Sequence, residues 1–170
     1  MGKVFEDGFS ELQADMVSIA LEYVENRAEK IYIYCSFEDG VLTSDVCYKI
    51  NGKVVHRHKL NDAILNNQPG YDVSIDRQKG LIRIINEDIG AIIKLCKEYQ
   101  REMPTEIKLV YDVIANKLNA DYGYDLYYSN HPTRTSNDVF EEWYKQIKEE
   151  EEKVIQEEAQ PKKKWFGLFG

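Results

Sequence analysis

The chain repeats one pattern: an apolar-striped helix runs into a tyrosine-rich hairpin in which apolar residues alternate. The first copy spans residues 10–50 and the second roughly residues 86–126. A shift of 76 residues, from Ile31 to Ile107, also aligns similar residues elsewhere in the hairpins: Ile33 with Leu109, Leu42 with Leu118, Asp45 with Asp121, Tyr48 with Tyr124, and Ile50 with Leu126. Apolar spacing of three or four residues is typical of helices, and spacing of two is typical of strands. The repeat therefore predicts two helix–hairpin units built on one plan.

The signals between and around the copies complete the element order. Ser10 with Gln13, and Thr135 with Asp138, have the spacing of capping boxes and predict the starts of the first and last helices. Asn51-Gly52 favours a two-residue turn, so a third strand is expected at residues 54–58.

The middle of the chain predicts a loop followed by a long helix. Residues 60–71 contain Asn, Gln, Pro and Gly, with a turn of helix expected at residues 62–65. Apolar residues from Ile75 to Tyr99 then recur at helical spacing, and the alternative is a strand at residues 81–85. The order α-β-β-β-α-β-β-α predicts an α+β domain. We expect one antiparallel sheet of about five strands, with the helices on one face.

Composition divides the chain into a domain and a tail. The composition predicts a single α+β domain over residues 1–148. Residues 149–170 form a charged, low-complexity tail that ends in a Lys/aromatic segment. The net charge of −8 argues against non-specific nucleic-acid binding, which needs clustered Lys and Arg, and is compatible with a basic protein partner.

The cysteines and the N-terminus predict a cytoplasmic protein. There are three cysteines, without metal-ligand spacing. In a hairpin register that pairs Phe37 with Val41, Cys35 and Cys47 do not face each other, and free thiols fit a reducing compartment. No signal peptide or membrane-length apolar run is present, and no motif calls for a cofactor or a metal.

Five strand residues are candidates for a partner-binding face. Asp45, Asp121 and Asp125 could form an acidic surface, with Tyr48 and Tyr124 as aromatic anchors, because tyrosine is enriched at interfaces. The alternative is an ordinary solvated sheet face with tyrosines packed in the sheet. Paired carboxylates could also serve acid–base chemistry or hold a metal, although no nucleophile setting accompanies them.

The C-terminal tail is the second candidate for interaction. Its lysines and aromatic residues could contact an anionic membrane or a protein groove, and the alternative is a disordered end. The residues concerned are Lys162, Lys163, Lys164, Trp165, Phe166 and Phe169.

Three stretches resemble the YezG-like family of bacterial antitoxins, and the resemblance covers roughly residues 9–148. They are Glu29–Tyr34 after the first helix, Pro104–Val113 with Lys117–Tyr124, and Asp138–Trp143 near the end. The resemblance implies an immunity protein of a polymorphic toxin system, including systems whose nuclease toxins are exported by type VII secretion. Such a protein is not an enzyme and binds its toxin inside the producing cell.

The sequence therefore predicts an immunity protein that masks the basic active surface of a toxin, which we expect to be a nuclease. It predicts no direct contact of this chain with nucleic acid. Two alternatives remain. One is an interaction adaptor that works through the C-terminal Lys/aromatic tail, and the other is a metal-dependent hydrolase that uses the strand carboxylates.

Overall fold

The computed structural model describes the backbone of residues 4–169, and the side chains of residues 4–151 and of Lys153. Its elements are α1 (Phe5–Tyr23), β1 (Lys30–Glu38), β2 (Val41–Ile50), β3 (Lys53–His56), the 3-10 helix η1 (Arg57–Ala63), α2 (Ile75–Glu98), β4 (Glu106–Asp112), β5 (Lys117–Gly123) and α3 (Ser136–Phe169). The strands form one antiparallel sheet in the order β3-β2-β1-β4-β5. The predicted α+β class, the number of strands and the order of elements are confirmed.

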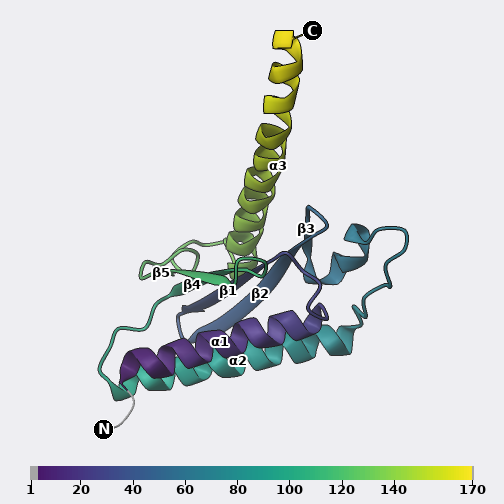
Figure 1. Ribbon diagram of the computed structural model, residues 1–170. Coiled ribbons are helices and arrows are strands. Elements are labelled where there is room, and N and C mark those ends of the chain that lie inside the picture. The colour runs from purple at the N-terminus through teal and green to yellow at the C-terminus, as the bar shows by residue number, and fades with distance from the viewer. Residues whose placement is uncertain (1–3, 170) are drawn as a thin grey trace.

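The larger core lies between one face of the sheet and the pair α1 and α2, which run side by side beneath it (Figure 1). Met16 and Ala20 of α1 and Ile85, Ile89 and Ile92 of α2 are buried there. Opposite them lie alternate residues of the strands: Ile31, Ile33, Val46, Tyr48, Ile107 and Leu109. The helix periodicity and the strand alternation of the sequence thus meet in one core.

The third helix covers the other face of the sheet, which corrects the expectation that all helices lie on one face. A smaller core contains Tyr32 and Tyr34 of β1 together with Val139, Phe140 and Ile147 of α3. The Tyr34 and Phe140 ring centroids lie 5.9 Å apart. Both faces of the central strand are therefore buried, which explains why β1 is buried at almost every position.

The β1–β2 hairpin has a register one residue different from the expected one. Phe37 pairs with Leu42, not Val41, because the turn contains two residues, Asp39 and Gly40, both with positive φ. Such a turn matches the twist of a hairpin better than the three-residue turn of the expected register. Cys35 and Cys47 do not pair with each other, and all three cysteines are free and buried.

Several element boundaries also differ from those predicted. α1 begins at Phe5, so Ser10 lies inside the helix and does not cap it. β3 ends at His56 and not at residue 58, and the 3-10 helix η1 occupies residues 57–63, so helical structure begins before the turn of helix expected at residues 62–65. Residues 81–85 lie within α2, so the alternative strand there is wrong.

The cap predicted at Thr135 is confirmed, and α2 has a side-chain cap as well. The Ser74 hydroxyl accepts from the backbone N–H of Arg77 at the start of α2. Before α3, the Thr135 hydroxyl accepts from the Asp138 N–H at 3.3 Å, and the Asp138 carboxylate accepts from the Thr135 N–H at 2.8 Å. This reciprocal pair is a capping box.

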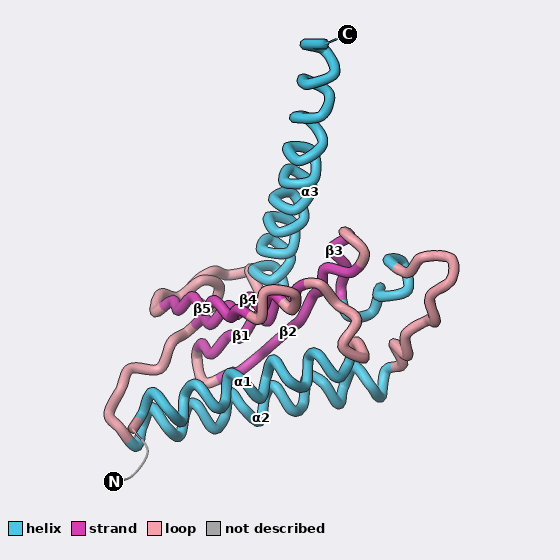
Figure 2. The backbone as a smooth tube through the Cα atoms, viewed as in Figure 1, coloured by secondary structure: helices cyan, strands magenta, loops and turns pink. Residues whose placement is uncertain are grey.

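The tail expected from residue 149 starts within a continuous helix, because α3 runs through that position and projects from the domain (Figures 1 and 2). Glu151, two residues past this boundary, is buried against the sheet. Its carboxylate accepts from Lys49 at 2.7 Å, from Lys30 at 2.9 Å and from the Tyr32 hydroxyl at 3.0 Å. Burial opposes ionisation, but these hydrogen bonds from Lys49, Lys30 and Tyr32 lower the pKa of Glu151 to about 2.

Candidate functional site

An aromatic groove lies at the β5 edge of the sheet, where α1 begins and α2 ends. We define the aromatic groove by Phe5 and Phe9 of α1, Pro104, and Tyr122 and Tyr124 of the β5 region; its volume is about 440 Å³. Within residues 4–169, β5 pairs with β4 alone and is an edge strand, and α1 and α2 leave much of its inner face uncovered. Tyr122 is 41% exposed and Tyr124 is 49% exposed.

Ring contacts hold the walls of the groove in place. Phe5 stacks on Phe9 with centroids 5.4 Å apart, and Phe9 meets Tyr122 edge-on at 5.4 Å. The side-chain amide of Gln13 donates to the Tyr122 hydroxyl at 2.5 Å. At the far end Phe5 also contacts Tyr99, at 5.9 Å. The rings therefore form a continuous row from the end of α2 to β5, with their apolar faces partly open to solvent.

Two carboxylates lie along this row, and we call Glu6 and Glu102, which line the groove, the acidic rim. Asp125 follows Tyr124 along the chain. Arg101 is the basic residue in the lining; it lies over the Phe5 ring at 4.7 Å and pairs with Glu6 at 3.2 Å. A backbone hydrogen bond and Arg101 keep the pKa of Glu6 below its ordinary value, so Glu6 is ionised at neutral pH.

The segment after β5 is fixed by contacts with the start of β4. The Thr105 N–H donates to the Gly123 carbonyl at 2.9 Å, and its hydroxyl donates to the Asp125 carbonyl at 2.5 Å. A side chain at Gly123 would collide with the Tyr127 ring, so glycine allows this close approach. Tyr124 and Asp125 are thereby held beside the groove.

The loop that follows is anchored by a buried carboxylate. Glu38, at the end of β1, accepts from the N–H groups of Tyr127 at 3.0 Å and Ser129 at 3.1 Å, and from the Ser129 hydroxyl at 2.7 Å. Burial acts in the opposite direction, but the donors, beginning with the Tyr127 N–H, lower the pKa of Glu38. The loop therefore has a charged anchor at neutral pH.

Three of the five predicted strand residues lie at this edge. Asp121 is exposed on β5 opposite Lys108, and Tyr124 and Asp125 follow the end of the strand. Of these, Tyr124 lines the groove together with Tyr122, which the sequence repeat did not single out. Asp121 lies on the opposite face of the sheet, the face that α3 covers, because it pairs with Lys108 and Lys108 pairs with Tyr34.

Tyr48 lies elsewhere, and its predicted role as a surface anchor is corrected. It is 0% exposed, and its hydroxyl donates to the Ala20 carbonyl of α1 at 2.9 Å. Its ring stacks on Tyr23 with centroids 6.2 Å apart. Tyr48 points inward with Val46 and Ile50, because the three share one strand face. It belongs to the core.

Asp45 is separated from Asp121 by the width of the sheet. The two lie in one row across the strands, Asp45–Tyr34–Lys108–Asp121, so three strand spacings separate them, about 14 Å. α3 covers the middle of the row, since Tyr34 contacts Phe140 and Lys108 lies 5.3 Å from the Trp143 ring. Asp45 itself forms an ion pair with Arg57. The two aspartates therefore do not form one contact face.

The tail residues Lys162, Lys163, Lys164, Trp165, Phe166 and Phe169 belong to the far end of the α3 backbone, and their side chains lie outside the described residues. In the described part of the chain, no group of three or more His, Cys, Asp and Glu residues is placed to hold a metal ion. His56, at the end of β3, contacts the Glu141 carboxylate at 2.9 Å and stacks on Tyr144 at 3.8 Å. None of the described helices has the length and apolar character needed to cross a bilayer.

The α1 half of the groove was not predicted, because the expected helix start at Ser10 excluded Phe5 and Phe9. A signal was available: Phe5 and Phe9 extend the apolar stripe of Leu12 and Met16 toward the N-terminus at helical spacing. Gly8 between them packs on α2, with Leu95 3.2 Å from the position of an added Cβ.

Comparison with known proteins adds no family to this description. No protein-family model matches the chain, and no curated protein is significantly similar to it.

Proposed function

We propose that the chain is an immunity protein that binds a basic protein toxin, with the aromatic groove and the acidic rim as its contact face. The observation that carries the proposal is the half-exposed pair Tyr122 and Tyr124 at a sheet edge, in a groove that Glu6 and Glu102 also line. Single exposed apolar residues are common on protein surfaces, but a connected aromatic row in a groove is typical of interaction sites.

The charges of the rim favour a basic partner. Glu6 and Glu102 line the groove with one cation, Arg101, which Glu6 already neutralises in part. Such a surface attracts Lys- and Arg-rich proteins and speeds their association, and salt weakens this effect. A nuclease binds its nucleic-acid substrate with a Lys- and Arg-rich surface, so covering that basic surface would block catalysis.

The resemblance of residues 9–148 to YezG-like antitoxins supports the same proposal. It implies stoichiometric binding, in which the toxin is held inactive in the cell that makes it. The binding energy would come from the aromatic residues, and the carboxylates would supply selectivity.

The experiment is capture of the partner from a lysate of the native cells by full-length protein, followed by an activity assay of the captured protein. We expect one basic toxin at stoichiometric level, inhibited by the wild-type chain and bound more weakly at high salt. The double variant Glu6→Lys/Glu102→Lys, which reverses both charges of the acidic rim, should lose inhibition. The control Asp62→Lys/Glu149→Lys changes two exposed acids remote from the groove by the same total charge and should retain it.

Other results contradict the proposal in distinguishable ways. Equal inhibition by the rim variant would show that another face makes the contact. Loss of the partner on deletion of residues 162–170 would favour the adaptor function. Hydrolysis by the purified chain that depends on Mg²⁺ or Mn²⁺ would favour an enzyme.

A further inference from the structure

The opposite edge of the sheet contains a strand segment without a partner. β3 pairs only with residues Cys47–Ile50 of β2. The preceding part, Val41–Val46, pairs with β1 on one side, and no strand of residues 4–169 pairs with it on the other.

Alternate backbone N–H and C=O groups of this segment point away from the sheet. The hairpin closes with a two-residue turn after Glu38, and alternation along an antiparallel ladder then directs the N–H and C=O groups of Leu42 and Ser44 away from β1. The Val46 N–H is satisfied instead by the Asp45 carboxylate at 2.8 Å. The two outward residues thus present donors and acceptors to another strand.

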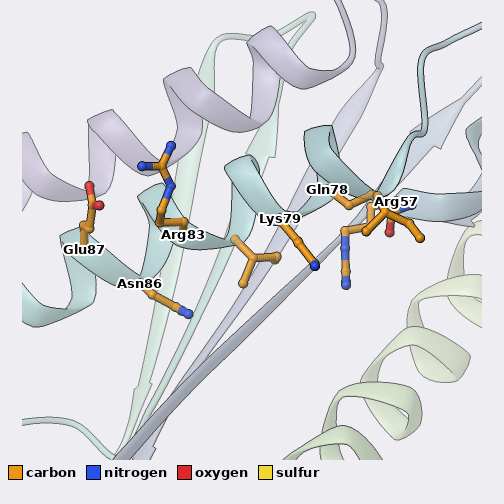
Figure 3. Close-up of a pocket in the computed structure, with 8 residues that line it drawn as sticks. Arg57, Gln78, Lys79, Arg83, Asn86 and Glu87 are labelled. Carbon is orange, nitrogen blue, oxygen red and sulfur yellow. The ribbon is translucent and has the colours of Figure 1, made fainter.

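A groove of about 700 Å³ lies along α2, beside this edge (Figure 3). Its wall on α2 includes Ile75, Lys79, Ile82 and Asn86, and Arg57 lies at one end. The Ser44 hydroxyl donates to the Asn86 side chain at 2.7 Å, which ties the free strand to the wall of the groove. Ile75 is 68% exposed, so the apolar lining is open to an incoming chain.

The charge of the groove is opposite to that of the whole protein. Arg57, Lys79 and Arg83 line it, and Glu87 is the acidic residue in the lining. Asp45 neutralises Arg57, but Lys79 forms no ion pair with any described side chain. Although the chain has a net charge of −8, the unpaired Lys79 makes this groove a local binding site for an acidic side chain.

We propose that the β2 edge and this groove receive an extended, acidic segment of a partner protein as a sixth strand. Lysine, proline or a bulge commonly prevents an edge strand of a sheet from pairing with another chain, and residues 41–46 contain neither lysine nor proline. In an added strand the backbone bonds to Leu42 and Ser44, and every second side chain enters the groove. Apolar side chains there contact Ile75 and Ile82, and a carboxylate pairs with Lys79. This site is separate from the β5 edge.

The probe for this proposal is a capped peptide of roughly eight residues, the length of an ordinary strand, with alternating valine and glutamate. We expect saturable binding in fluorescence anisotropy, with amide shifts at Leu42 and Ser44 in NMR spectra. Lys79→Glu should weaken binding about tenfold, which corresponds to about 1.4 kcal/mol. Lys94→Glu, an equally exposed charge reversal on α2 outside the groove, should leave binding unchanged.

The same peptide with N-methyl groups on alternate backbone nitrogens tests the strand addition itself. Methylation removes backbone donors and keeps the side chains, so one of the two alternating methylation patterns should abolish binding. Binding that tolerates both patterns, or that ignores Lys79→Glu, would overturn the proposal. So would a dimer of the chain that Lys79→Glu dissociates and the peptide does not displace, because the occupant would then be a second copy.

Discussion

Ile33 of β1 pairs directly with Leu109 of β4 at the centre of the sheet, and these are the two residues that the 76-residue repeat makes equivalent. A pair of equivalent residues facing each other in antiparallel strands lies on a local twofold axis. The hairpins β1–β2 and β4–β5 are therefore arranged about this pair, and β3 is added outside the symmetry.

Truncation at the axis should destabilise the whole domain. Ile33 and Leu109 are both 0% exposed, so Ile33→Ala and Leu109→Ala should each lower the free energy of unfolding by about 3 kcal/mol. Because the side chains share one core, the double variant should lose less than the sum of the two. Urea denaturation of the four proteins measures this, and strict additivity would argue against direct coupling.

Glu151 should contribute to stability although it lies beyond the expected end of the domain. Glu151→Gln leaves Lys30 and Lys49 without their shared anion, and we expect a loss of about 2 kcal/mol at pH 7. The folded pKa of about 2 lies below the ordinary 4.5, so the contribution is present above pH 4.5 and disappears as pH falls toward 2. Thermal unfolding against pH tests this, with Glu149→Gln as the exposed control.

A truncation pair gives a second test of the same contact. A chain ending at Lys148 should melt lower than one ending at Lys153, because only the longer chain retains Glu151. Equal melting temperatures would contradict the role of this carboxylate.

Asp88 should make the stability of the packed helices α1 and α2 depend on pH in the direction opposite to that of Glu151. Burial, followed by the Asp15 carboxyl on α1, raises the pKa of Asp88 to about 7 from an ordinary 3.8. The folded state then binds a proton that the unfolded state has released, so stability falls as pH rises from about 4 to 7. Asp88→Asn should stabilise the protein at pH 8 by on the order of 1 kcal/mol and have little effect at pH 4.

The measurement for Asp88 is chemical denaturation at both pH values. Glu98→Gln, an exposed carboxylate farther along α2, serves as the control. A stabilisation of the same size at both pH values would contradict the assignment to the Asp88 proton.

Tyr48 and Tyr124 should give opposite results in two assays. Tyr48→Phe removes the hydrogen bond to Ala20 and should cost about 1 kcal/mol of stability, with partner binding unchanged. Tyr124→Ala should leave the melting temperature nearly unchanged and weaken partner binding. Calorimetric melting and partner capture measure the two effects, and weaker capture by folded Tyr48→Phe would contradict the core assignment.

The sequence predicts the helices and strands well because local signals specify them. It predicts strand register and the packing of helices on the sheet less well. The repeat makes Tyr48 and Tyr124 equivalent, but the second hairpin has a four-residue loop, residues 113–116, where the first has two residues. β5 is therefore displaced by two residues along β4, and Tyr122, opposite Ile107, occupies the place that Tyr48 has opposite Ile31. A two-residue displacement preserves the faces, so periodicity could not reveal it.

The candidate site was predicted in part for the same reason. Tyr124 was found because it follows a recognisable strand. The other wall of the groove comes from Phe5 and Phe9, which meet β5 only through tertiary packing. The position of α3 was also hidden, because β1 alternates aliphatic and tyrosine residues, and tyrosine suits both solvent and a second core.

The joint between β1 and β4 sets the order in which the domain can assemble. Each hairpin closes over a few residues and can form within microseconds, whereas β1 and β4 must meet across a chain segment of roughly seventy residues. Neither hairpin has a buried face until that meeting occurs and α1 and α2 close beneath it. The cooperative step of folding is therefore the docking of two halves, and α3 can settle on the second face only after the sheet beneath it exists.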